Sequence, residues 1–164
     1  MLFRSTNPEV GEALVQLYSQ LTSEDVRYVG KLEVAEAAKV IENVQRDINI
    51  ALVNELARIF PAMDVDVEDV LSAAATKWNF HRYTPGVGVG GHCIAVDPWF
   101  IVARDEVNSQ LIHTAREVND HKTVWVTEQI KLAAADFNAQ SGKKPRIACL
   151  GLSFKPDIDD LRES

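Results

Sequence analysis

The sequence predicts a mainly α-helical fold that carries partial α/β elements at both ends. One helical pattern without an interior Gly or Pro runs from about Val34 to Phe60. Apolar residues at helical spacing also recur over residues 109–137, which are expected to form two helical stretches. Residues 147–154 form a compact apolar run of the kind that builds a buried parallel strand. These patterns predict a helical centre flanked by pieces of neighbouring domains.

The N-terminal elements are short. A helix is expected within residues 7–22, with Pro8 near its start, because apolar residues recur there at helical spacing. Residues 27–32 are either a strand end or a connector. The apolar positions of the first helix are Val10, Ala13, Leu14, Leu17 and Leu21.

The helix expected over residues 34–60 carries one apolar stripe that should be buried. It would be about 40 Å long at a rise of about 1.5 Å per residue. Because a small domain rarely buries a helix of that length by itself, we expect a second subunit to cover it. The stripe consists of Val34, Ala38, Ile41, Ile48, Leu52 and Ile59, with Glu55 as a polar exception.

Three further segments complete the organisation. Residues 64–77 predict a helix that Asp66 could cap. Residues 138–146 are polar and turn-forming, which is typical of a linker. The strand-type run after them has no partner strand in the sequence, so the chain is expected to be an excised central piece of a larger enzyme.

Composition excludes several classes of function. The chain has 164 residues, of which 46% are hydrophobic and 25% charged, with a formal net charge of −7. This acidic balance argues against a nucleic-acid surface. No apolar run approaches the roughly 20 residues of a membrane span, and the first residues lack a secretory signal. Two distant cysteines suggest free thiols in a reducing compartment, so the expected location is the cytoplasm.

The loop "PGVGVGG" contains a G-x-G-x-x-G match at Gly86, Gly88 and Gly91. A dinucleotide-binding fingerprint must follow a strand, open a helix and have an acidic residue about 20 positions on. The preceding residues suit an irregular approach, Pro98 resists a helix across the junction, and Asp105 lies too close. The match is therefore interpreted as accidental.

Cys93 lies two residues after Gly91 and has two open interpretations, a reactive thiol or a small packed residue. The adjacent His92 cannot easily turn back to act as its base, and no ligand spacing supports zinc. Lys39 and Asn43, four residues apart on one helical face, are equally compatible with a plain solvated surface.

Three segments together, "AEAAKVIENVQRDINIALVNELA", "PGVGVGGHCIAVDPWF" and "GLSFKPDIDDLRES", resemble the signatures of the UDP-glucose/GDP-mannose dehydrogenase family. The resemblance covers essentially the whole chain and is closest to the UDP-N-acetylhexosamine branch. It implies that residues 1–30 end an NAD-binding Rossmann-like domain. Residues 31–138 would be the helical central domain that builds a homodimer through its long helix. Residues 139–164 would be the linker and first strand of a UDP-binding domain.

The resemblance also implies an activity, the NAD-dependent four-electron oxidation of a sugar C6 alcohol to a carboxylate. The expected substrate is UDP-N-acetyl-D-mannosamine, with UDP-GlcNAc, UDP-GalNAc or UDP-glucose as alternatives, and the expected role is surface polysaccharide synthesis. Cys93 matches the nucleophile that forms a thiohemiacetal and then a thioester. Lys39 and Asn43 match residues that polarise the C6 oxygen, and Asp97 matches a carboxylate that assists water or proton transfer.

Binding residues follow from the same resemblance. Lys77 stands where relatives place an Arg from the partner subunit, although Lys cannot make the same bidentate contact. His92 is expected to help read the N-acetylhexosamine. The other substrate-contacting positions are Thr84, Pro85, Gly86, Val87, Gly88, Val89, Gly90 and Lys155. The cofactor-contacting positions are Arg162 and the backbone of Cys93, Ile94, Ala95 and Val96, and no metal is expected.

Two other hypotheses compete with this one. The isolated chain would be a dimerisation module without activity, or Cys93 would serve a hydrolase that needs no NAD. Cys149, inside the apolar strand-type run, is expected to be packed and inert.

Overall fold

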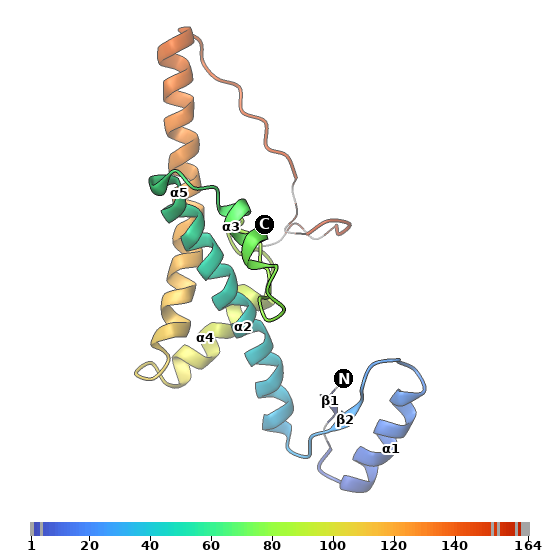
Figure 1. The fold of residues 1–164 in the computed structure, drawn as a ribbon. Helices are drawn as coiled ribbons and strands as arrows, with labels where there is room; N and C mark the ends of the chain where they lie inside the picture. The colour runs from blue at the N-terminus through green and yellow to red at the C-terminus, as the bar shows by residue number, and fades with distance from the viewer. Residues whose placement is uncertain (1, 4, 152, 154, 160, 162–164) are drawn as a thin grey trace. The chain divides into compact units, whose positions relative to one another are not determined.

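The computed structural model describes residues 2–3, 5–151, 153, 155–159 and 161. The chain is mainly helical (Figure 1). It divides into two compact units, residues 1–43 and 44–164. None of the helices in the described ranges is both long and apolar enough to span a bilayer. The elements are β1 (Leu2–Phe3), α1 (Pro8–Ser19), β2 (Arg27–Tyr28), α2 (Leu32–Ile59), the 3-10 helix η1 (Phe60–Met63), α3 (Val67–Ala74), α4 (Cys93–Arg104) and α5 (Gln110–Ser141).

The first unit is a small β1–α1–β2 arrangement followed by the start of α2. β1 and β2 pair in parallel, with Leu2 opposite Arg27. The predicted first helix is confirmed, because α1 begins at Pro8 and the Asn7 side chain accepts the Glu9 N–H at 2.9 Å. Gly11 is buried in α1, and a Cβ there would lie 2.5 Å from the ring of Tyr28 in β2. The contact between α1 and β2 therefore requires a residue without a side chain at this position.

The long helix α2 is confirmed as an element, but its predicted apolar stripe is not the face that is buried within the single chain. Leu52 and Ile59 of the predicted stripe are 52% and 46% exposed. The buried side chains include Asn43, Asp47 and Asn54, which are at most 2% exposed. An apolar pattern predicts the buried face of a helix on the assumption that polar side chains stay in water. Polar side chains can be buried instead where other groups of the protein bond to them, as happens here.

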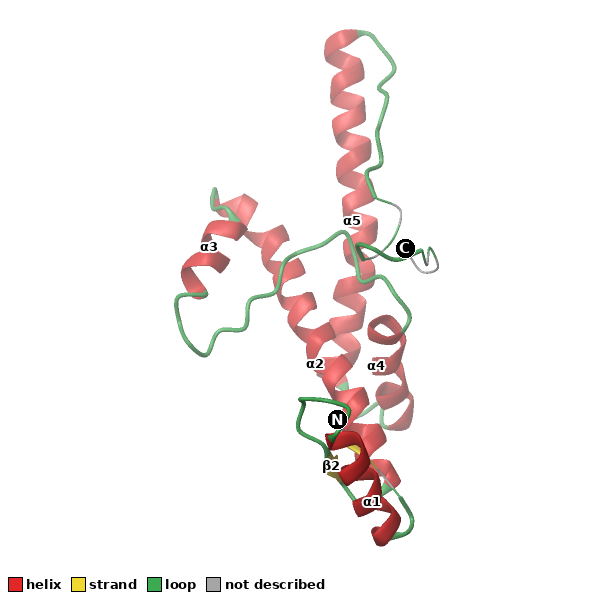
Figure 2. Cartoon of the chain, turned by 90° about the vertical axis from the view of Figure 1, so that its right-hand side faces the viewer, coloured by secondary structure: helices red, strands yellow, loops and turns green. Residues whose placement is uncertain are grey.

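The partners of Asp47 and Asn54 lie on α5 in the second unit. Arg116 Nη1 donates to Asp47 Oδ1 at 2.7 Å, and both side chains are at least 97% buried. Arg116 Nη2 also donates to Asp120 on the same helix. Burial raises the pKa of the Asp47 carboxyl, and the Arg116 charge offsets part of that rise. Figures 1 and 2 show α2 and α5 crossing, and this ion pair joins them.

A second buried cation lies further along α5. Lys122 is 4% exposed, and its Nζ lies 4.4 Å from the ring centroid of Trp125, a cation–π contact. Burial lowers the pKa of Lys122, and the nearby Arg58 charge lowers it further. The contact between α2 and α5 therefore includes buried charged and polar groups beside the buried apolar residues Val44, Ala51 and Val53 of α2.

The short helix α3 confirms the predicted cap. The Asp66 side chain accepts the Glu68 N–H at 2.7 Å, and Leu71 is 2% exposed. The helix is shorter than the predicted 64–77, because η1 precedes it and Asp64 adopts a left-handed conformation at φ 57°. This left-handed residue ends the α2–η1 segment.

The two helices α4 and α5 pack against each other, with the Trp99 and His113 rings edge to face at 5.4 Å. α5 is a single helix where two helical stretches were predicted. It continues through Ser141 and ends at Gly142, whose φ is 65°. The predicted linker at 138–146 is therefore helical in its first residues, because only a glycine in the left-handed conformation stops the helix.

The apolar run after the linker is not a strand in its described residues. Ile147 is 60% exposed and Leu150 93% exposed. Cys149, which was expected to be packed, is exposed. A strand needs a neighbour to receive its backbone hydrogen bonds, and no described strand pairs with this segment.

The buried ion pair should contribute more stability than an exposed one. Asp47→Ala leaves the Arg116 charge buried without its main partner, so we expect the free energy of unfolding to fall by about 3–5 kcal/mol. Glu68→Gln is the control, because it breaks an exposed pair with Arg82 and should cost less than about 1 kcal/mol. Urea unfolding of both variants measures the difference, and equal losses would contradict this account.

Candidate functional site: the glycine loop and the start of α4

The predicted nucleophile and its carboxylate lie together at the start of α4. Cys93 is the first residue of this helix and is exposed, and Asp97 lies one turn further along and is half-buried. Side chains four residues apart on a helix are neighbours. The first turn also leaves backbone N–H groups without helical partners, which favours negative charge close to Cys93. His92 precedes the helix and makes no side-chain capping bond.

One reason for rejecting the dinucleotide fingerprint is wrong. A helix does open two residues after Gly91, and Pro98 lies inside it as a buried residue. Proline removes one backbone donor and frees one carbonyl, that of Ile94, without ending the helix here. The expected irregular approach to the loop is confirmed, because residues 75–92 contain no strand.

The loop of predicted substrate contacts, residues 84–90, is held in place by side chains of α2 and α5. Gly86 N–H donates to Asn54 Oδ1 at 2.9 Å, and Thr123 Oγ1 donates to the Val87 carbonyl at 3.3 Å. A Cβ on Gly88 would lie 2.4 Å from Thr123 Oγ1. Figure 2 shows the loop leaving α3, reaching α5 and turning back to α4. The glycines thus allow the loop backbone to lie directly against α5.

The predicted residues Lys39 and Asn43 belong to the first unit, on α2. Lys39 is exposed, and its Nζ lies 3.2 Å from Glu42 Oε2. Asn43 is 2% exposed. The two residues therefore lie on the same side of the helix, but Lys39 is in contact with solvent and Asn43 is buried.

The remaining predicted contacts are spread over the chain. Lys77 follows α3 and is exposed, with its N–H bonded to the Ala74 carbonyl at 3.1 Å. Lys155 is exposed in the C-terminal segment. Arg162 lies outside the described residues. Ile94, Ala95 and Val96 are half-buried in the first turn of α4.

Sequence reasoning missed the residues that hold the loop, Asn54 and Thr123, and the buried Asn119 behind them. Asn43, Asp47 and Asn54 recur at helical spacing along α2, and that recurrence of short polar residues was the available signal. It was overlooked because a buried helical face was expected to be apolar.

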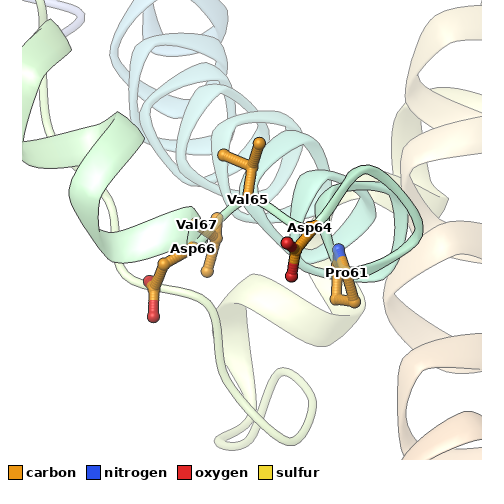
Figure 3. Close-up of a pocket in the computed structure, with 5 residues that line it drawn as sticks. All are labelled: Pro61, Asp64, Val65, Asp66 and Val67. Atoms are coloured by element: carbon orange, nitrogen blue, oxygen red, sulfur yellow. The ribbon is translucent and has the colours of Figure 1, made fainter.

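Open hollows occur among the described residues, but away from the predicted nucleophile. One of about 520 Å³ lies at the junction of η1 and α3 and is lined by Pro61 and residues 64–67 (Figure 3). Another of about 500 Å³ lies between α2 and the segment before the glycine loop, with Leu52 and Tyr83 among its lining residues. Neither is lined by Cys93. In the described parts of the chain, no group of three or more His, Cys, Asp or Glu could hold a metal ion.

Curated relatives carry specific names. The chain is 52% identical over 133 residues to the UDP-N-acetyl-D-mannosamine dehydrogenase of Escherichia coli (strain K12), covering 79% of this chain and 32% of the relative. It is 47% identical over 157 residues to the NDP-N-acetyl-D-galactosaminuronic acid dehydrogenase of Ralstonia nicotianae, covering 96% and 36%. The chain thus spans about a third of the length of these relatives.

Solved structures agree with the curated relatives. The UDP-N-acetyl-mannosamine dehydrogenase from S. aureus matches with a TM-score of 0.78 and 33% identity, over 99% of this chain and 38% of that one. A UDP-D-ManNAc dehydrogenase from Pyrococcus horikoshii matches with a TM-score of 0.83 and 28% identity, with the same coverages. Residues 33–121 match the central domain of one protein family. The chain therefore belongs to the UDP-glucose/GDP-mannose dehydrogenase family.

Proposed function

We propose that this chain is the central part of an enzyme that oxidises the C6 alcohol of a UDP-N-acetylhexosamine to a carboxylate, with UDP-N-acetyl-D-mannosamine as the substrate. The observation that carries this proposal is the placement of Cys93. The thiol is exposed at the start of α4, directly after a glycine loop, with Asp97 one turn away. Relatives named for this substrate are about half identical to the chain, which supports the choice of sugar.

Cys93 would carry the second oxidation. Its sulfur attacks the aldehyde carbon made in the first step, and the aldehyde oxygen takes a proton to complete a thiohemiacetal. Loss of a hydride and a proton turns that adduct into a thioester. Water then adds to the thioester carbon, and the C–S bond breaks to release the carboxylic acid and the thiol. The aldehyde thus stays attached to the enzyme between the two oxidations.

Three other side chains assist in this proposal. Asp97 takes the proton from the attacking water, because its carboxylate is one helical turn from the sulfur. Lys39 and Asn43 polarise the C6 oxygen, a role that suits one cation and one amide donor. The backbone of residues 84–90 lies along the nucleotide sugar, where glycines permit close approach.

NAD is the proposed cofactor. Two NAD molecules would be used in succession, and each would accept the hydride of one oxidation. Ile94, Ala95 and Val96 fit a flat ring beside Cys93, since they are small or apolar and only half-buried. Arg162 is a further proposed contact. The β1–α1–β2 order supports assigning residues 1–30 to the end of the NAD-binding domain. Residues 31–138 and 139–164 are then the central domain and the start of the UDP-binding domain, which contributes Lys155.

We also propose a homodimer through α2. The exposed apolar residues of this helix, among them Leu52 and Ile59, form a stripe that water would otherwise cover. Lys77 would reach the partner's substrate, and His92 would contact the N-acetyl group. Without its neighbouring domains, the chain would serve only as the dimerisation part.

The complete enzyme should form two NADH per sugar with UDP-N-acetyl-D-mannosamine. The matching experiment supplies NAD with UDP-ManNAc, UDP-GlcNAc, UDP-GalNAc and UDP-glucose separately and counts NADH by absorbance. Two NADH with another N-acetylhexosamine would correct the substrate only. One NADH per sugar would remove Cys93 from the second oxidation, and none with any sugar would overturn the proposal.

Replacing Cys93 by Ala should abolish acid formation, because no other described group at the start of α4 can hold the aldehyde covalently. We expect a loss of more than about a thousandfold in kcat for the four-electron reaction. Cys149→Ala is the matched control, since this second thiol is also exposed but plays no proposed part. Acid production that persists in Cys93→Ala would sink the covalent mechanism.

The isolated chain should sediment as a dimer at micromolar concentration and should not bind NAD. Leu52→Glu places a charge on the proposed interface and should halve the apparent mass, because a buried unpaired charge is costly. Val107→Glu changes a 77% exposed residue between α4 and α5 and should leave the mass unchanged. A wild-type monomer at high micromolar concentration would contradict the interface.

A further inference from the structure

The glycine loop is connected to the buried ion pair by an unbroken chain of side-chain hydrogen bonds. Gly86 N–H donates to Asn54 Oδ1 at 2.9 Å, and Asn54 Nδ2 donates to Asn119 Oδ1 at 3.0 Å. Asn119 Nδ2 donates to Asp47 Oδ1 at 2.8 Å and to the Asp47 carbonyl at 3.0 Å. Arg116 completes the chain at Asp47. The loop therefore rests on the best-buried polar groups of the second unit.

This chain has a fixed direction. The Asn54 side-chain oxygen accepts from Gly86, so the Asn54 amide nitrogen donates to Asn119. The Asn119 amide nitrogen then donates to Asp47. An aspartate at position 54 could accept from Gly86 but could not donate to Asn119, and an aliphatic residue could do neither. Both asparagines are at most 1% exposed, so water cannot replace a lost partner cheaply.

The loop has few means of fixing itself. Among the described backbone hydrogen bonds outside helices and strands, none involves residues 81–91. Glycines lose more conformational freedom on ordering than other residues, so a glycine-rich loop without internal bonds adopts one conformation only if other segments hold it. Asn54 holds it at Gly86, and Thr123 holds it at Val87.

We propose that Asn54 and Thr123 are positioning residues, which set the loop backbone in the conformation that receives the nucleotide sugar. Neither side chain contacts the reacting atoms. Each acts through the backbone that leads to Cys93. The inference rests on the proposed function, because the loop is given a substrate there. It goes further in assigning the geometry of the loop to two specific hydrogen bonds.

Thr123 offers the cleaner variants, because it is exposed and its replacement does not disturb the buried chain. Thr123→Val keeps the side-chain shape and loses the hydroxyl donor, whereas Thr123→Ser keeps the hydroxyl and loses the methyl group. Thr127→Val is the control, since Thr127 Oγ1 donates to the Thr123 carbonyl one turn away and does not contact the loop. Asn54→Ala removes the stronger contact.

Amide hydrogen exchange in the complete enzyme tests the contacts themselves, independently of activity. We expect exchange of the Gly86 amide, the loop N–H that donates to Asn54, to rise about tenfold in Asn54→Ala and about threefold in Thr123→Val, where the loop leaves this position more often, the range set by one lost hydrogen bond. Thr123→Ser and Thr127→Val should match the wild type. Unchanged exchange in Thr123→Val, or the same increase in Thr123→Ser, would overturn the role of the hydroxyl.

Steady-state kinetics with the best UDP-sugar and NAD test the positioning role. Thr123→Val should raise KM for the UDP-sugar about three- to tenfold while KM for NAD stays constant, and Thr123→Ser should restore the wild-type value. A purely structural role would lower the active fraction, and so kcat, without changing either KM. Faster exchange with an unchanged KM for the sugar would overturn the inference and leave the proposed function intact. A wild type that oxidises no UDP-sugar would overturn both, whatever the exchange rates.

Discussion

The second unit depends on one buried ion pair, Asp47 with Arg116. Two helices that meet through charged groups must match those groups in position and direction, since a buried charge without a partner is costly. The Asp47 carboxylate satisfies that requirement by receiving both the Arg116 guanidinium and the Asn119 amide. Within the second unit, the crossing of α2 and α5 is thereby held at one register, and the loop bonded to both helices is placed with it.

The glycine loop is the main element attached in this way. It contributes almost no structure of its own, and its conformation comes from contacts to α2 and α5. α4 follows the loop and packs on α5. The segment that carries Cys93 is therefore attached to α5 both through the loop and through α4. A flexible sequence next to the proposed nucleophile can thus be held in one conformation without side chains that would block the proposed substrate.

The polar contact between α2 and α5 also explains where the apolar residues of α2 go. Because Asp47 and Asn54 bond to side chains of α5, the residues Leu52 and Ile59 remain on the outside. An exposed apolar stripe on a long helix is costly in water and favours burial against another surface. On α2, Asn54 therefore faces inward and bonds to the loop, whereas Leu52 and Ile59 face outward into the proposed subunit contact.

The sequence by itself determined the helices α1, α2 and α3, the cap at Asp66 and the family, because these depend on local spacing and on short motifs. It did not predict the helix α4 around Pro98 or the polar side chains of α2 that are buried within the chain, and it split α5 in two. Only the tertiary structure decided these, since whether a polar side chain is buried depends on a partner 69 residues away, as Arg116 is from Asp47. The recurrence of short polar residues along α2 marks a polar face, but it does not identify the partner that allows that face to be buried.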